Sequence, residues 1–340
     1  MASFEILENL DALVRLRDEW RDLVCRDPLA TPFQTPEWLL SWANIYRPSR
    51  PRILTLREGR DLVGLYPLMQ KGSPWASLRP IGLGPSDYLQ PILQGPEYSS
   101  ILWEGLRSQS TSHLLDLHQI RENHPLANEK GIAQANCLVL DLPGSFDDYL
   151  KRLGKSLRYD VRRFDKVGVT LDFATEETLP QDLDTFFALH ETRWKQRMLP
   201  GAFVGSKVKH FHLEWGQKAI SRGMLWLAIL RQGGQAVGAI YVMRHGQTAY
   251  FYQAGFDPSF KAISPGSLLV SQLIRRSIED GLTSFDFLRG DEPYKRRWQP
   301  QREYKNVRIL ISDSSLGRLG ERWNTFAHQI EMRVRRQLEG

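Results

Sequence analysis

Ionisable side chains crowd the segment that follows a short apolar run near residue 285. Asp286 lies within that run, and the alternation of apolar residues predicts a strand over 284–288. An unpaired carboxylate among apolar strand residues is costly, so we expect Asp286 to have a partner or a task. The polar residues that follow are Arg289, Asp291, Glu292, Tyr294 and Lys295. They stand where the strand ends, the position at which clefts open in α/β proteins.

The chain just upstream predicts a phosphate-binding helix terminus. A helix is expected to begin at Ser264, with Ser264 as N-cap and Pro265 as the first helical residue. Gly266 and Ser267 leave the first-turn amides accessible, and such amides lie at the positive end of the helix dipole. An ordinary capped helix is the alternative. The order strand, capped helix, strand and polar segment favours a cleft for a phosphorylated cofactor.

A strongly basic helix is predicted earlier in the same half of the chain. Lys155, Arg158, Arg162 and Lys166 recur at three- and four-residue steps, so they share one helix face. The face is either simply solvated or turned toward an anionic partner. Strands are predicted over 169–174, 225–231, 236–245, 248–254, 284–288 and 306–312, and helices near 145, over 183–196, over 211–223 and from 264 to 281.

The N-terminal half shows the same alternation of helices and strands. Apolar residues from Leu10 to Leu23 predict one amphipathic helix, and Thr35-Pro36-Glu37 predicts the start of another. Paired strands are expected over 52–57 and 62–70. Pro143-Gly144-Ser145 reads as a boundary, so the chain is predicted to be an α/β protein of two modules, 1–144 and 145–312.

Length and composition agree with two globular modules. The chain has 340 residues, of which 41% are hydrophobic and 25% charged. Its net charge of +6 favours anionic partners, with nucleic acid the least favoured because no zinc-finger or RNP-type pattern is present. Cys25 and Cys137 form no metal-spaced set, so we expect two buried free thiols and no metal. Without an apolar signal segment or a run of roughly 18 apolar residues, a cytoplasmic protein is expected.

One block of the sequence resembles a known family. Residues 252–298 read YxAGFDP, then SPG, then GxxxFDFLxGDxxYKxxW. This pattern resembles the CelD/BcsL-like acetyltransferases, GNAT-superfamily proteins related to the FemABX peptidyltransferases. The resemblance extends to residues 153–163 and 190–194, and more weakly to residues 33–38 and 84–88. Of the usual GNAT phosphate loop, Arg/Gln-x-x-Gly-x-Gly/Ala, only Gly266 is matched.

The resemblance implies an architecture and a cofactor. It implies two tandem GNAT-like modules, each a mixed, mostly antiparallel sheet flanked by helices. The first module would lie on the acceptor side, and the second would bind acyl-CoA as co-substrate. The residues assigned to acyl-CoA are Ser264, Pro265, Gly266, Ser267, Arg289 and Lys295.

The resemblance also implies catalytic roles. Tyr294 matches the position of a tyrosine acid that would protonate the leaving thiolate, and a packing tyrosine is the alternative. Asp286 or Asp291 would deprotonate the incoming ammonium, unless each serves a salt bridge. His190 is the other candidate base, with a structural role as its alternative.

The amine acceptor would lie against residues of both modules. Arg158 and Arg162 would face an anionic acceptor or the CoA phosphates. The loop 82–88 contains Pro85, which has no amide proton for a phosphate, so one CoA per chain is expected. Asp87 and Tyr88 would then face the acceptor, with Asp87 holding its ammonium or else capping a turn.

The tail from Leu316 predicts an amphipathic basic helix over 313–340. Its apolar stripe is Leu316, Leu319, Trp323, Phe326, Ile330, Val334 and Leu338. Docking onto the protein's own surface or onto a second copy in a homodimer is favoured over peripheral contact with a membrane.

Three functions remain open at this point. The leading hypothesis is acyl-CoA-dependent N-acylation of a small, sugar-linked or lipid-linked amine, in envelope, polysaccharide or sphingoid-type lipid metabolism. The second is aminoacyl transfer from aminoacyl-tRNA, as in FemABX proteins, which predicts a long helical-hairpin insertion that the sequence lacks. The third is a non-catalytic module of polysaccharide biosynthesis.

Overall fold

The structure is a computed structural model that describes residues 1–72, 76–110, 114–127, 131–195 and 201–313. The chain forms two compact units: residues 1–134 together with the described residues from Lys305 onward, and residues Ala135–Tyr304. The sequence boundary was predicted at Pro143–Ser145, whereas the units divide between Gln134 and Ala135 and again after Tyr304. The predicted C-terminal helix lies outside the described residues.

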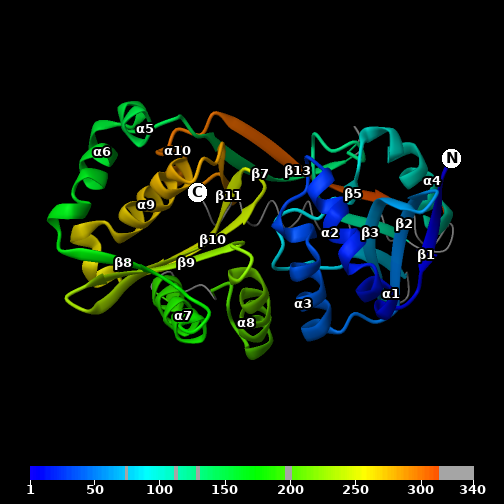
Figure 1. Cartoon of the computed structure of the whole chain (residues 1–340), viewed down its shortest axis with the longest axis horizontal. Helices are drawn as coiled ribbons and strands as arrows, with labels where there is room; N and C mark the ends of the chain where they lie inside the picture. The colour runs from blue at the N-terminus through cyan, green and yellow to red at the C-terminus, as the bar shows by residue number, and fades with distance from the viewer. Residues whose placement is uncertain (73–75, 111–113, 128–130, 196–200, 314–340) are drawn as a thin grey trace. The chain divides into compact units, whose positions relative to one another are not determined.

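The second unit is a mixed sheet with helices on both faces, as Figure 1 shows. Its strand order is β7-β12-β11-β10-β9-β8, and only β11 and β12 run parallel. Helices α7 and α8 cover one face, and α5, α6 and α9 cover the other. The elements are β7 (Ile132–Asp141), α5 (Phe146–Arg152), α6 (Lys155–Arg162), β8 (Val169–Phe173), α7 (Leu179–Lys195), α8 (Ser206–Ile220), β9 (Leu225–Gln232), β10 (Gln235–His245), β11 (Thr248–Phe256), α9 (Pro265–Glu279), β12 (Ser284–Arg289) and α10 (Pro293–Arg296).

The first unit is built in the same way. Its strand order is β1-β2-β3-β4-β6-β13, with β5 paired to β3, and only β4 and β6 run parallel. The single helix predicted from Leu10 to Leu23 is two helices, which meet at Leu16. The elements are β1 (Ala2–Leu7), α1 (Leu10–Arg15), α2 (Arg17–Arg26), α3 (Pro36–Tyr46), β2 (Pro51–Glu58), β3 (Asp61–Lys71), β4 (Ser77–Pro80), β5 (Ile92–Leu93), α4 (Ser99–Ser110), β6 (Leu114–Arg121) and β13 (Arg302–Ile311).

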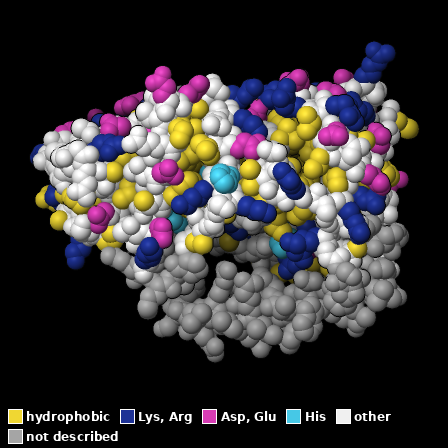
Figure 2. All heavy atoms as spheres, turned by 90° about the horizontal axis from the view of Figure 1, so that it is seen from below, with side chains coloured by type: hydrophobic (Ala, Val, Ile, Leu, Met, Phe, Trp, Pro, Cys, Tyr) yellow, Lys and Arg dark blue, Asp and Glu magenta, His cyan; other side chains and the backbone are white. Residues whose placement is uncertain are grey.

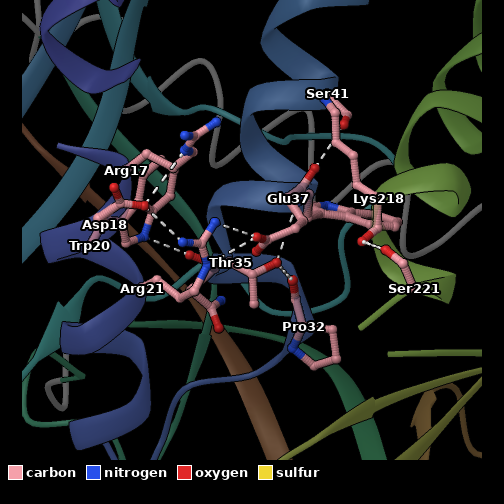
Figure 3. A network of polar contacts seen from close by, with 12 residues as sticks. Arg17, Asp18, Trp20, Arg21, Pro32, Thr35, Glu37, Ser41, Lys218 and Ser221 are labelled. Atoms are coloured by element: carbon pink, nitrogen blue, oxygen red, sulfur yellow. Dashed lines mark hydrogen bonds and ion pairs between the residues drawn. The ribbon is translucent and has the colours of Figure 1, made fainter. Parts of the chain in front are cut away.

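An ion pair between half-buried Arg21 and buried Glu37 joins α2 to α3 in the first unit (Figure 3). Arg21 donates from Nη2 and Nε to Oε1 of Glu37, over 2.8 and 3.1 Å. Thr35 is the N-cap of α3, its hydroxyl accepting the Trp38 amide, and Pro36 is the first helical residue, as predicted. The pair lets the α3 carboxylate be buried, since a buried charge is tolerated only when it is paired.

The two units repeat one topology. In each, four strands pair antiparallel, the fourth pairs parallel with the fifth, and the fifth pairs antiparallel with a sixth. The predicted mixed, mostly antiparallel sheets flanked by helices are therefore confirmed. The sixth strands are exchanged along the chain: β7 follows β6 in sequence but completes the second unit, and β13 follows β12 but completes the first. This exchange explains why the sequence boundary differs from the structural one.

A cluster of charged side chains lies next to the parallel strands β4 and β6 of the first unit. Asp116 on β6 is fully buried and accepts a hydrogen bond from Nε of Arg308 over 2.6 Å. Nε of Arg79 lies 2.9 Å and Nε2 of His118 lies 2.8 Å from its carboxylate oxygens. Burial raises the pKa of Asp116, but its hydrogen bonds to His118 and Arg308 outweigh burial and hold that pKa well below its usual range.

Two further findings concern the whole described chain. Both cysteines are free, but Cys25 is exposed, so the prediction of two buried thiols is wrong for this residue. None of the helices in the described ranges is long and apolar enough to cross a bilayer.

We predict that Asp116→Asn destabilises the protein by about 3 kcal/mol, because it leaves the buried guanidinium of Arg308 without its counter-charge. The unfolding midpoint in urea measures the effect. Asp22→Asn, an exposed change on α2, serves as the control and should leave the midpoint within about 0.5 kcal/mol of wild type. Equal midpoints for the two variants would contradict the importance of the buried cluster.

Candidate active site

A cavity of about 200 Å³ opens in the second unit at the point where β11 and β12 part. The two strands are paired from Thr248 and Ser284 to Tyr250 and Asp286, and the cavity lies against β11 residues beyond that point. Its lining is Leu157, Arg193, Ala254, Phe256, Gly266, Ser267, Val270, Tyr294, Arg297 and Trp298. The structure thus brings together three of the predicted site residues, Gly266, Ser267 and Tyr294.

The first turn of α9 forms one wall of this cavity. Ser264 occupies the N-cap position as predicted, but in the left-handed region (φ 55°), and its side chain makes no capping hydrogen bond. Its carbonyl instead accepts the amides of Ser267 and Leu268. Pro265 has no amide proton, and within the described residues the Gly266 amide has no acceptor. Gly266 therefore offers the free donor of this turn, rather than the pair of open amides expected from the sequence.

Space next to Gly266 is open. A Cβ atom at this position would lie 3.6 Å from the ring of Phe256, which is an ordinary van der Waals contact. A glycine is therefore not required by the fold here. It leaves volume in the cavity beside a positively polarised helix end.

Arg193 forms a second, unpredicted wall. Its Nη1 donates to the carbonyl of Ala254 over 3.0 Å, and its guanidinium carbon lies 5.0 Å from the centre of the Phe256 ring. Arg193 comes from α7, and it belongs to the stretch 190–194 that was noted for the family resemblance. The resemblance therefore drew attention to the stretch that contains Arg193. The contact of this arginine with β11 depends on helix packing that the sequence does not reveal.

His190 lies one turn away on α7 and does not line the cavity. It is buried between the rings of Phe186 and Phe203. A Cβ atom on Gly255 would overlap the His190 backbone, so helix and strand approach closely here. Burial, with a smaller contribution from the charge of Arg193, lowers the pKa of His190 to about 4. The imidazole is therefore neutral at pH 7 and packed in an apolar environment.

The loop after β12 contributes Tyr294 to the cavity, whereas its charged residues Lys295 and Asp291 contact other groups of the same segment. Lys295 is buried and donates from Nζ to the carbonyls of Arg289 and Gly290, over 2.6 and 3.3 Å. Asp291 accepts both Nε and Nη2 of Arg296, over 2.5 and 2.6 Å, and this pairing lowers its pKa. In this structure neither Lys295 nor Asp291 faces the cavity, so neither is placed for the role predicted from the sequence.

The buried carboxylate of Asp286 has a hydrogen-bond partner, as expected from the sequence. Its Oδ1 accepts the amide of Leu288 over 2.7 Å, and Leu288 has a left-handed backbone (φ 57°). The pairing of β12 with β7 shifts register between Asp286 and Arg289. The carboxylate thus stabilises an irregularity in the strand and does not line the cavity.

The predicted acceptor residues fall in different units. Asp87 and Tyr88 belong to the first unit and are buried. The Tyr88 ring lies 4.3 Å from the guanidinium of Arg121, and its carbonyl accepts Nε2 of Gln34. Arg158 and Arg162 line a second concavity of the second unit. The roles of these residues stay predictions.

The described residues contain no group of three or more His, Cys, Asp or Glu arranged to hold a metal ion. The cavity instead presents groups that bind anions and move protons: a helix amide, two arginines and a phenol. Arg297 lies 3.8 Å from Asp160 of α6, and Trp298 is fixed through its carbonyl by the Tyr149 hydroxyl. These contacts with α6 and α5 hold the two lining residues Arg297 and Trp298 in position.

Comparison with protein families shows that most of this site lies in a region similar to GNAT domains. Residues 151–296 match the family model described as an acetyltransferase (GNAT) domain. The matched region includes Arg193, α9 and Tyr294. Most of the second unit is thus similar to GNAT acetyltransferase domains, which supports a transferase.

Solved structures share the fold of both units. FemX is similar with a TM-score of 0.63 and 11% identity, covering 86% of this chain and 96% of that one. The C-terminal domain of a putative lysylphosphatidylglycerol synthetase from Agrobacterium fabrum is similar with a TM-score of 0.56 and 13% identity, covering 90% and 95%. L-PGS from Bacillus licheniformis is similar with a TM-score of 0.53 and 16% identity, covering 84% of this chain and 96% of that one. No curated protein sequence matches the chain. At these identities the likeness establishes the fold alone.

Buried histidines predict a pH-dependent stability. Burial lowers the pKa of His190 to about 4 and of His212 on α8 to about 3, whereas an unfolded histidine titrates near ~6.5. The unfolded chain binds more protons between these values, so stability rises with pH there. We expect full stability above about pH 7 and a progressive loss as the pH falls from about 6.5 toward 4.

The test compares urea midpoints at pH 7.5 and pH 5. His212→Phe keeps an aromatic ring in a cluster of aromatic side chains, so its midpoint should change less with pH than that of wild type. His210→Gln, an exposed change on the same helix, should keep the wild-type pH dependence. The same pH dependence in all three proteins would rule out the buried histidine as its source.

Proposed function

We propose that this chain is an N-acyltransferase that moves an acyl group from a CoA thioester to an amine, with the donor bound by residues 146–312. The observation that carries the proposal is the cavity itself. It joins a helix N-terminus with a free amide, the end of β11 and the phenol-bearing residue Tyr294 in one site. These are groups that bind a phosphate, hold a carbonyl and supply a proton.

Each group has a proposed part in the transfer. The amine nitrogen attacks the thioester carbon, a C–N bond forms and the C–S bond breaks. Tyr294 gives its proton to the departing sulfur, and the proton that the nitrogen loses as the amide forms restores the phenol through water. The Gly266 amide and the α9 dipole bind a phosphate of the donor. Arg193 fixes the Ala254 carbonyl and so the edge of β11 along which the donor would lie.

The contacts do not favour the three bases suggested by the sequence. Asp286 is committed to the Leu288 amide, Asp291 to Arg296, and His190 is buried away from the cavity. We propose that the amine enters the site in its neutral form or loses its proton to water. The acceptor would be a small, sugar-linked or lipid-linked amine. The CelD/BcsL-like pattern of residues 252–298 supports a role in polysaccharide or envelope biosynthesis.

Aminoacyl transfer is a second candidate, and the fold shared with FemX and L-PGS favours it. An ester-linked aminoacyl donor presents the same reacting carbonyl, so the cavity chemistry would be similar. The two candidates differ in the leaving group. Release of free thiol from acetyl- or longer acyl-CoA in the presence of an amine panel supports the first; transfer only from aminoacyl-tRNA supports the second.

Changes at Gly266 test the donor site. Gly266→Ala places its Cβ in ordinary contact with Phe256 and should bind CoA as wild type does. Gly266→Val adds two methyl groups to the cavity and should weaken CoA binding about tenfold, the effect of overpacking by about 1–3 kcal/mol. Calorimetry gives the affinities and thermal unfolding checks the fold. Equal CoA affinity in the valine and alanine variants would contradict the assignment of CoA binding to the first turn of α9.

Removal of one oxygen tests the acid. Tyr294→Phe keeps the ring in the cavity wall and removes only the proton donor. The turnover number should fall by about 100-fold or more while CoA affinity stays near wild type, because general acids typically contribute about 100- to 10,000-fold. Steady-state kinetics and calorimetry separate the two effects. A turnover number within threefold of wild type would leave Tyr294 as a packing residue.

A further inference from the structure

A second concavity of the second unit, about 520 Å³ in volume, has only positive charges in its lining. We name it the α6 groove, and its polar and aromatic lining is Lys155, Arg158, Tyr159, Arg162, Arg163 and Lys166. None of these five cations forms an ion pair with a carboxylate of the described residues. The face of the protein in Figure 2 shows the usual pattern, with Lys and Arg interspersed among Asp and Glu.

Two of the arginines are held in place by the backbone. Arg158 donates from Nη2 to the carbonyls of Lys151 and Leu153, over 3.0 and 2.8 Å. Arg163 donates from Nη1 to the carbonyl of Ala262 over 3.3 Å. Carbonyl partners fix the guanidiniums without neutralising them. Like charges held together repel one another, and a polyanion bound among them relieves that repulsion.

An aromatic ring stands among these charges. Tyr159 is 65% exposed, although a large side chain gains nothing from exposure. The guanidinium carbon of Arg163 lies 5.6 Å from the centre of the Tyr159 ring. Cations combined with an accessible aromatic ring are the recurring means of binding a phosphate and a nucleobase together. A simple anion would need the cations but not the ring.

Helix α6 contributes residues to both the groove and the active-site cavity. Leu157 lines the cavity and Arg158, the next residue, lines the groove. Helix α6 also packs against α9, whose first turn forms the cavity wall. Helix α6 thus contributes to the lining of both the cavity and the α6 groove.

We propose that the α6 groove binds the adenosine nucleotide of the acyl donor, with the base on Tyr159 and the phosphates on the surrounding cations. The inference rests on the proposed function, since that function requires a donor with a nucleotide end. Two donors carry this chemistry: CoA, with its phosphorylated adenosine, and an aminoacylated RNA, with its terminal adenosine. The proposal concerns the adenosine nucleotide that both donors share, and the experiment distinguishes CoA from RNA as its source.

The test measures binding to the full chain by calorimetry, with adenosine 3′,5′-bisphosphate and with an RNA hairpin ending in CCA as separate probes. The groove variant is Lys155→Gln/Arg162→Gln/Lys166→Gln, three exposed side chains. The matched control is Arg60→Gln/Lys71→Gln/Lys207→Gln, which removes the same charge at exposed positions elsewhere. We expect the groove variant to bind a nucleotide probe at least about tenfold more weakly than wild type, because each lost phosphate contact weakens binding, while the control binds as wild type does.

The ring is tested separately. Tyr159→Ala should weaken nucleotide binding about tenfold, and Tyr159→Phe should retain it, because stacking needs the ring and not the hydroxyl. Inorganic pyrophosphate should bind the alanine variant and wild type equally. This split is not expected if Tyr159 has only a structural role.

Each outcome decides the inference. Groove-dependent binding of the bisphosphate supports it and identifies CoA as the source; groove-dependent binding of the hairpin alone supports it and identifies RNA. Equal binding of the probes by groove and control variants overturns it, as does binding of anionic vesicles with neither nucleotide probe. None of these readouts requires transfer. If a nucleotide binds through the groove but no acyl group is transferred, the proposed function fails and the groove assignment stands.

Discussion

The separation of two parallel strands controls the chemistry of this protein. β11 and β12 pair over three residues of each strand and then part, so that beyond Tyr250 β11 remains paired with β10 on one edge but no longer with β12 on the other. Backbone polar groups removed from water must find partners, and Arg193 supplies one by donating to Ala254. The first turn of α9 comes against the same opening, and Tyr294 reaches it from the loop after β12. The cavity is thus a direct consequence of interrupted strand pairing.

The first unit meets the same constraint with a different solution. Its parallel pair, β4 and β6, is even shorter, and charged side chains around Asp116 occupy the region beyond it. Asp116 and Asp286 stand two residues after the first parallel pair of their respective units. One carboxylate contacts two arginines and a histidine, and the other accepts a backbone amide and does not line the cavity. Two copies of a fold have therefore diverged at one equivalent position.

The sequence predicted what local patterns determine. The helix start at Ser264 follows from turn residues, the mixed sheets follow from the resemblance to GNAT proteins, and the structure has both. Arg193 was not found because its partner, Ala254, is 61 residues away. Lys295 was assigned to the cofactor and Asp291 to proton transfer because charge alone does not show that a loop uses them for its own backbone and side chains. The boundary was displaced because strand exchange is a non-local pairing.

That exchange of strands has a consequence for how the protein acquires its structure. When residues 1–134 have left the ribosome, the sheet of the first unit lacks its sixth strand, and β6 is a free edge. Unpaired edges invite association with other strands, and contacts between distant segments slow folding. β13 is made only after the whole of the second unit. The first unit therefore waits for the synthesis of β13, and maturation of the two units is coupled through the order of translation.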